Sequence, residues 1–350
     1  MHALIAINAL VFFAMLADGA GLIQPNSAVH LRWGANFGPI TKDGEWWRLL
    51  ACTFLHFGLV HLAMNMWVLW GAGGLVERLY GNFTFLAIYL FAGLTGSFAS
   101  LLWNADKVVS AGASGAVFGV YGALAAYVLR ERGSVPGSVL KSLTGSTVAF
   151  IIYSIVLGAA ISAIDNAAHA GGLVGGFALG LVLARPLSPR VPLSAVRVLG
   201  ATIFAASLLS LLYFVLPPPA YSYSAQKAAS EAIKTFAAEE EALARKASAL
   251  VEARRTGRIT DLEVSEGIER DLLPGWNQAH ARFSAIRLEE TAPAARALRA
   301  LTEYVATRRD MFAHYAAGMK SGDQARIAKA EALAAEAQRM MKEKRELPRQ

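Results

Sequence analysis

Long apolar stretches recur along the first two thirds of the chain, and they restrict the fold more than any other feature. A helix needs about 20 predominantly apolar residues to cross the hydrocarbon core of a bilayer. Seven stretches approach or reach that length, at residues 3–17, 55–76, 83–103, 113–129, 146–163, 167–184 and 195–216. Spanning segments must satisfy their backbone hydrogen bonds internally, so the pattern predicts an all-α, polytopic membrane region. The first stretch is short enough for a signal peptide, but only His2 precedes it, so we expect a retained span.

The ionised residues divide at Pro217. Of 33 Lys and Arg, 11 precede this residue and 22 follow it; of 26 Asp and Glu, 7 precede it and 19 follow it. A net charge of +7 is compatible with nucleic-acid binding,. In the tail, however, the charges alternate in sign, which is typical of solvated helix faces. We therefore predict a soluble tail and no nucleic-acid partner. The single Cys52 excludes a disulfide within one chain.

The positive charges of the short loops indicate an orientation. They follow the second, fourth and sixth predicted spans, at Arg78, at Arg130, Arg132 and Lys141, and at Arg185, Arg190 and Arg197. Lys and Arg concentrate on the cytoplasmic side of membrane proteins. The long loop at residues 18–48 and the tail then lie outside. We expect a multi-pass protein of a bacterial inner membrane.

Polar side chains inside three predicted spans need a partner or a function. His61 and Asn65 lie one turn apart on one face of the second span,. Ser114 opens the fourth span, and His169 lies near the outer end of the sixth. Taken singly, the histidines can be structural, and the small residues around Ser114 can serve helix packing. By the predicted topology all lie at a similar depth, which favours one shared site.

The chemistry that this set supports is acyl transfer. A serine hydroxyl needs a base within hydrogen-bond reach, and histidine, with an unperturbed pKa of about 6.5, is largely neutral near pH 7. An asparagine amide, a second histidine and a backbone N–H can stabilise the oxyanion. Gly112 and Gly115 leave room beside Ser114 for a substrate backbone,.

Two other catalytic arrangements fit the sequence less well. Ala116 stands where the nucleophile elbow of soluble α/β-hydrolases has its last glycine,. Asp165, one turn before His169, lies in a predicted loop, so a Ser-His dyad is the simpler interpretation. His56 and His61 also suggest a metal site, but the spans contain no carboxylate to complete it. We therefore predict no metal and no cofactor.

The order of these motifs resembles the rhomboid intramembrane serine proteases over most of residues 1–216. That family has a Trp-Arg pair in the first outer loop, His-x-x-x-Asn in the second span, Gly-x-Ser-Gly opening the fourth, and a histidine followed by glycines in the sixth. The matching residues here are Trp47 and Arg48, His61 and Asn65, Gly112 to Gly115, and His169 with Gly172, Gly176 and Gly180.

The resemblance implies a role for each matching residue. Ser114 becomes the nucleophile and His169 the base, while His61, Asn65 and the Ser114 N–H form the oxyanion hole. Gly112, Gly115, Trp47 and Arg48 have supporting roles, with Arg48 anchoring the outer loop on loop carbonyls or lipid phosphate. The resemblance also implies a Phe118 ring against His169, a structural His56, membrane-protein substrates that enter from the bilayer past the fifth span, and a "six plus one" arrangement of spans.

The sequence predicts four parts: a six-span core at residues 1–185, a loop and seventh span at 186–216, a Pro-rich linker at 217–223, and a helical extramembrane domain at 224–350. In the tail we expect a helix to about Arg255, a short second helix capped by Thr260 and Glu263 and stopped by Pro274, and two further helices,. These helices are expected to form a hairpin or small bundle whose apolar stripes pair with each other, with a second copy or with a substrate.

Two non-proteolytic functions are alternatives. A rhomboid-like scaffold or chaperone for membrane proteins would use the tail as a binding module, although such relatives typically lack the serine or histidine that this chain has. A transporter is disfavoured because the spans show no ionisable relay and no broken-helix repeat.

Overall fold

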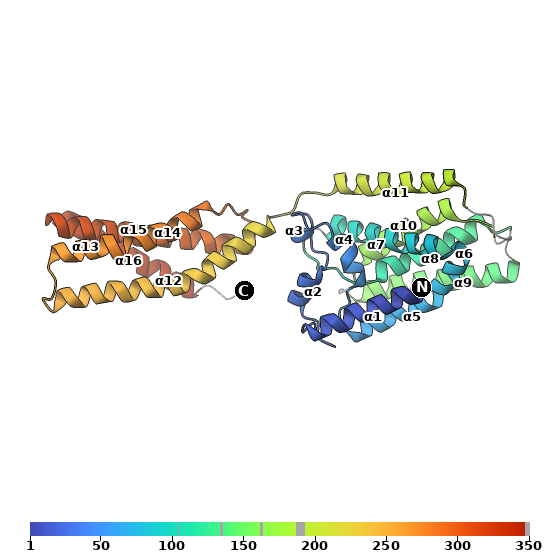
Figure 1. Cartoon of the computed structure of the whole chain (residues 1–350), viewed down its shortest axis with the longest axis horizontal. Coiled ribbons are helices and arrows are strands. Elements are labelled where there is room, and N and C mark those ends of the chain that lie inside the picture. The colour runs from blue at the N-terminus through green and yellow to red at the C-terminus, as the bar shows by residue number, and fades with distance from the viewer. Residues whose placement is uncertain (105, 134–135, 162–163, 187–192, 347–350) are drawn as a thin grey trace. The chain divides into compact units, whose positions relative to one another are not determined.

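The computed structural model describes residues 1–104, 106–133, 136–161, 164–186 and 193–346. The last two residues of the predicted fifth span, 162 and 163, and Arg190 lie outside the described residues. The chain divides into two units, a membrane unit at Met1–Pro219 and a tail unit at Ala220–Gln350. Every element labelled in Figure 1 is a helix, which confirms the all-α class.

Each predicted span corresponds to one helix or, for the second span, to three joined helical segments. They are α1 (His2–Ala17), α5 (Leu59–Val68) continued through η2 (Leu69–Gly73) into α6 (Gly74–Tyr80), α7 (Asn82–Asn104), α8 (Ser114–Arg130), α9 (Gly137–Ala160), α10 (Asn166–Leu183) and α11 (Ala195–Val215). Among the described residues, five of these seven runs have the length and composition to cross a membrane, while α1 and α8 are apolar but shorter.

The helix that contains the predicted fifth span begins before that span. The helix α9 begins at Gly137, directly after Pro136, and not at residue 146. Its first turns contain Lys141, Ser142 and Thr144, which lower the local hydropathy without preventing helix formation,. Proline has no backbone N–H and fixes its own φ, so a helix readily begins beside it. Hydropathy found the apolar part of this helix and missed its polar first turns.

The centre of the membrane unit is formed by α7, α8 and α10, which pack closely because glycine faces glycine. A methyl group at Gly172 would lie 2.0 Å from the Gly115 carbonyl oxygen, and one at Gly176 would lie 2.1 Å from the Gly119 carbonyl oxygen. Carbon and oxygen cannot approach so closely, so only hydrogen fits at these positions. This small-residue stripe joins α10 to α8 along their length.

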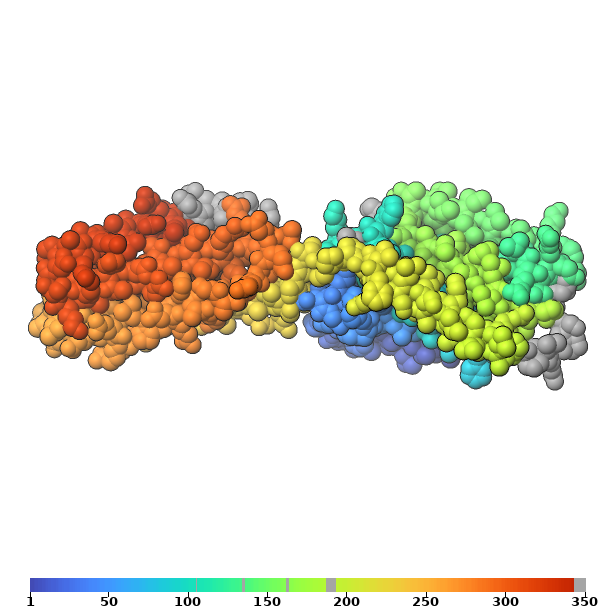
Figure 2. All heavy atoms as spheres, turned by 90° about the horizontal axis from the view of Figure 1, so that it is seen from above, coloured from blue at the N-terminus to red at the C-terminus, as the bar shows by residue number. Residues whose placement is uncertain are grey.

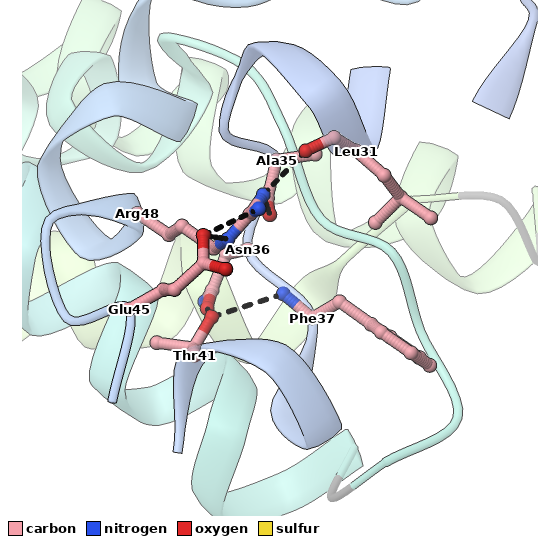
Figure 3. A network of polar contacts seen from close by, with 7 residues as sticks. All are labelled: Leu31, Ala35, Asn36, Phe37, Thr41, Glu45 and Arg48. Carbon is pink, nitrogen blue, oxygen red and sulfur yellow. Dashed lines mark hydrogen bonds and ion pairs between the residues drawn. The ribbon is translucent and has the colours of Figure 1, made fainter. Parts of the chain in front are cut away.

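The long segment between α1 and α5, called the outer loop after its predicted side, folds into short helices, α2 (Ser27–Trp33), α3 (Gly38–Thr41) and α4 (Arg48–Ala51), followed by η1 (Cys52–Phe54). Arg48 holds this loop together (Figure 3). Its Nη1 donates to the carbonyl oxygens of Leu31, at 2.5 Å, and Ala35, at 3.2 Å, while Nε and Nη2 donate to Glu45. Of the two predicted anchors for Arg48, the structure therefore has the loop carbonyls.

Replacing Arg48 with glutamine is expected to destabilise the full chain by about 2 kcal/mol, because buried carbonyls lose charge-assisted hydrogen bonds. Thermal unfolding in detergent measures the effect. Arg32→Gln, on the same loop, is the matched control: its ion pair with Asp18 is exposed, so the change should stay within about 0.5 kcal/mol,. Equal shifts for the two variants would contradict the anchoring role.

The helix of the seventh predicted span, α11, lies at the edge of the membrane unit with most of its surface uncovered (Figure 2). Its outer end contacts the outer loop, where Trp46 meets Tyr213 edge-on with ring centroids 4.9 Å apart. Lys42 forms an ion pair with Asp106 at 2.9 Å and donates to the carbonyl oxygen of Pro218 at 3.3 Å. These contacts hold the end of α11 and the proline run that follows it.

The tail unit consists of α12 (Tyr223–Arg255), α13 (Asp261–Asp271), α14 (Leu273–Ala285), α15 (Ala295–Ser321) and α16 (Gln324–Glu346). Thr260 and Glu263 form the predicted capping box. The predicted apolar stripes share one core within the unit. The predicted second helix, α13, ends at Asp271, before Pro274. The sequence did not predict α14, which begins at Leu273 and has Pro274 in its first turn, where the missing N–H costs nothing,. The missed helix contributes Trp276, which packs against the rings of Phe236, Tyr304 and Phe312.

Candidate active site

Ser114 is the first residue of α8 and follows a constrained loop. Gly112 has a φ of 141°, in the region that favours glycine,. Its N–H donates to the carbonyl oxygen of Cys52 at 2.9 Å, and Ser110 pairs with Asn36 of the outer loop. The start of α8 is therefore tied to two parts of the outer region, which fixes where the half-buried Ser114 lies.

His61, in the first turn of α5, turns one edge of its ring toward this loop. A methyl group at Gly112 would lie 2.7 Å from His61 Cε1, 2.9 Å from His61 Nε2 and 3.7 Å from the Ser114 hydroxyl oxygen. One point next to Gly112 is thus within reach of both side chains. A side chain at Gly112 would fill it, which gives the glycine a steric reason in addition to its φ.

The other edge of the His61 ring indicates which nitrogen carries hydrogen. The backbone N–H of Phe57 donates to His61 Nδ1 at 3.2 Å. A neutral imidazole has one N–H, so an accepting Nδ1 places the hydrogen on Nε2, the nitrogen that faces Gly112. His61 is therefore oriented as a hydrogen-bond donor toward the space beside Ser114.

Asn65 lies one turn after His61 on the same helix and is buried. Its Nδ2 donates to the His61 carbonyl oxygen at 3.0 Å. An amide nitrogen carries two hydrogens, and this bond uses one of them. Asn65 thus has the chemistry of a second donor on the face that carries His61.

The glycine stripe between α8 and α10 brings His169 to the start of α8. A methyl group at Gly115 would lie 3.3 Å from the carbonyl oxygen of Ala168, so the neighbours of Ser114 and His169 are in contact. One turn after Ser114, the Phe118 ring stacks on the His169 imidazole, with centroids 4.1 Å apart and planes at 13°. The expected ring contact is present, and it orients the imidazole along the first turn of α8.

Asp165 does not serve as a third member of the site in this structure. Its carboxylate accepts from the backbone N–H of Ala168 at 3.0 Å, from the Ser100 hydroxyl at 2.6 Å and from Asn104 Nδ2 at 2.9 Å. Within the described ranges, His169 Nδ1 is buried and makes no hydrogen bond. The carboxylate caps α10 and links it to α7, and none of its three hydrogen bonds involves the His169 ring.

The remaining predicted residues lie elsewhere. Trp47 and Arg48 belong to the outer loop, where the guanidinium lies 4.9 Å from the Trp47 ring centroid. His56, which was predicted to be structural, lies beside the site. The N–H of Ala113, next to Ser114, donates to its Nε2 at 3.5 Å. The sequence-based analysis did not identify His30, a lone histidine of α2 with no motif around it.

Helices that cross a membrane, with a serine and two histidines gathered where three of them meet, define a polytopic membrane protein with a candidate acyl-transfer site. A Rhomboid domain model matches residues 43–186. The chain belongs to the rhomboid family, a family of intramembrane serine proteases.

Three relatives illustrate the similarity. Rhomboid protease GluP of Bacillus subtilis (strain 168) is 35% identical over 271 residues, covering 76% of this chain and 47% of that protein. RHOMBOID-like protein 4 of Arabidopsis thaliana is 36% identical over 163 residues, covering 46% of this chain and 40% of that protein. Rhomboid protease AarA of Providencia stuartii is 30% identical over 245 residues, covering 64% of this chain and 83% of that protein.

The chain spans less than half the length of the Bacillus and Arabidopsis relatives. The match to the Bacillus protein covers more of this chain than the membrane unit alone contains. The similarity to that protein therefore continues into the tail unit.

Proposed function

We propose that this protein is an intramembrane serine endopeptidase that cleaves transmembrane or membrane-anchored proteins with a Ser-His dyad. Ser114 is the nucleophile and His169 the general base. The observation that carries the proposal is the meeting of α5, α8 and α10, where His61 Nε2 faces the Ser114 hydroxyl across Gly112 and Phe118 holds the His169 ring. Residues 1–185 form the catalytic core, and residues 224–350 form a separate helical domain.

The reaction follows from these positions. His169 accepts the proton of the Ser114 hydroxyl as its oxygen attacks the carbonyl carbon of the scissile peptide. The oxyanion that forms accepts hydrogen bonds from His61 Nε2–H, the Asn65 amide and the Ser114 N–H. His169 then gives its proton to the departing amine, and the C–N bond breaks. A water molecule hydrolyses the acyl-enzyme in the same two stages and restores Ser114.

Substrates reach the dyad from the bilayer, past α9. This helix has little buried surface, and its main aromatic contact to the core is Phe150 against Phe118 and Tyr121 of α8. The loop charges support a dyad toward the outer side of a bacterial inner membrane, with the tail on that side. The tail is a binding module for a partner, a second copy or a substrate.

A covalent probe tests the proposal on the full chain in detergent. A fluorophosphonate reacts only with an activated serine, so we expect labelling at Ser114, identified by peptide mass spectrometry, and none in Ser114→Ala. Comparing the membrane proteomes of cells that express either form should reveal fragments released only by the wild type. A folded wild-type protein that neither labels nor releases fragments would overturn the proposal.

A further inference from the structure

His30 is a fully buried histidine of α2, and both of its ring nitrogens contact backbone carbonyl oxygens. Nδ1 lies 2.8 Å from the carbonyl oxygen of Asn26, and Nε2 lies 3.0 Å from that of His56. A carbonyl oxygen only accepts and a neutral imidazole carries one N–H, so the His30 ring donates to one of these two oxygens, and in the tautomer with hydrogen on Nε2 it donates to His56,. The His30 ring also stacks on Phe57, with centroids 4.4 Å apart. His30 thus holds two consecutive residues, His56 and Phe57, from outside the site.

The same two residues contact the site on their other side. The Phe57 N–H donates to His61 Nδ1, and the Phe57 ring lies parallel to the His61 ring, at 7° and 6.3 Å. His56 Nε2 accepts from the Ala113 N–H, next to Ser114. The segment at residues 56–57 therefore lies between His30 and the proposed oxyanion hole.

We propose that His30 is a positioning residue that keeps His61 in the tautomer with hydrogen on Nε2. This inference rests on the proposed function, in which His61 donates to the oxyanion. If residues 56–57 shift, the Phe57 N–H no longer aligns with Nδ1, and hydrogen can occupy Nδ1 instead. Nε2 then presents a lone pair to the oxyanion and repels it, so the effect appears in the transition state and not in substrate binding.

A double-mutant cycle on the full chain measures the coupling. His30→Phe keeps a ring but removes the N–H donor. We expect kcat to fall about 10- to 100-fold, part of the effect of losing an oxyanion-hole donor, with KM changed less than about threefold. In a His61→Ala background the same change should have no further effect, because both act through one group. His30→Gln, which retains a donor, should recover most of the rate.

Two further variants make the cycle specific. Arg32→Gln changes an exposed side chain of the same helix and should leave kcat unchanged. Phe57→Leu keeps the backbone N–H and removes the stacking ring, so it should lower kcat less than His30→Phe does. If His30→Phe does not fold, Phe57→Leu replaces it in the cycle with His61→Ala. Additive effects of His30→Phe and His61→Ala would overturn the inference.

A second measurement needs no turnover. In protein labelled with ¹⁵N in its histidine rings, the His61 signals, assigned by their loss in His61→Ala, should show hydrogen on Nε2 in the wild type. In His30→Phe they should move toward tautomer-averaged shifts, with no change in Arg32→Gln. Unaltered His61 shifts in His30→Phe would overturn the inference. If the wild type cleaves no faster than Ser114→Ala, the proposed function is wrong. The NMR result still tests whether His30 controls the His61 tautomer.

Discussion

Ser114→Ala, His169→Gln and the double variant are all expected to lower the rate of peptide cleavage by about 10⁴-fold or more, and by nearly the same factor. A nucleophile without its base and a base without its nucleophile are equally ineffective, so members of one catalytic unit are strongly non-additive. Both substitutions are small, and neither residue is needed for the glycine stripe that packs α8 on α10.

The measurement is single-turnover cleavage of a model transmembrane substrate by purified protein in detergent. Thermal unfolding of each variant establishes that it is folded. The control is Ser100→Ala, which removes a hydroxyl that donates to Asp165 and should change the rate far less than His169→Gln. Multiplicative losses in the double variant would mean that Ser114 and His169 do not act together.

Gly176→Ala is expected to destabilise the protein by about 3 kcal/mol, although alanine is the better helix former. The added methyl group would lie 2.1 Å from the Gly119 carbonyl oxygen and 2.4 Å from its Cα, so the two backbones must separate. Overpacking of this kind costs about 1–3 kcal/mol or more. Separation of α8 and α10 also moves Ser114 away from His169, so cleavage should fall with stability.

Gly200→Ala is the matched control for this prediction. It makes the same chemical change in α11, where a methyl group would have no neighbour within 4 Å. The helix propensity of alanine should then raise stability, by up to about 1 kcal/mol. The two variants therefore shift the melting temperature in opposite directions. A fall of similar size in both would show that the glycine contact does not determine the packing.

Much of the fold follows from patterns that the sequence displays directly. The seven apolar stretches predict the helices of the membrane unit because hydrocarbon leaves a chain few alternatives. The four-residue spacing of Gly172, Gly176 and Gly180 predicts a close helix contact, and the structure shows its partners, Gly115, Gly119 and Ala123. Periodicity likewise found four of the five tail helices. It missed α14, which begins at Leu273 and has Pro274 in its first turn.

The candidate site could be predicted only as far as motifs reach. Ser114, His61, Asn65 and His169 stand in recognisable surroundings, but their placement in one site depends on tertiary contacts. Two features had no signal in the sequence. His30 acts through a loop whose course only the folded structure shows, and the carboxylate of Asp165 could have faced His169 until its three donors were seen.

Because the Asp165 carboxylate caps α10 and does not bond the His169 ring, the net charge of the site differs from that of a soluble triad. A soluble triad keeps a buried carboxylate beside its imidazole, and burying an ion is costly unless it is well compensated. The proposed site contains serine, histidine and asparagine side chains, which are neutral before reaction in the proposed mechanism. In the proposed reaction, charge appears only during turnover, as an imidazolium and an oxyanion whose sum is zero. A resting site without net charge is one that a protein can keep within the thickness of a membrane.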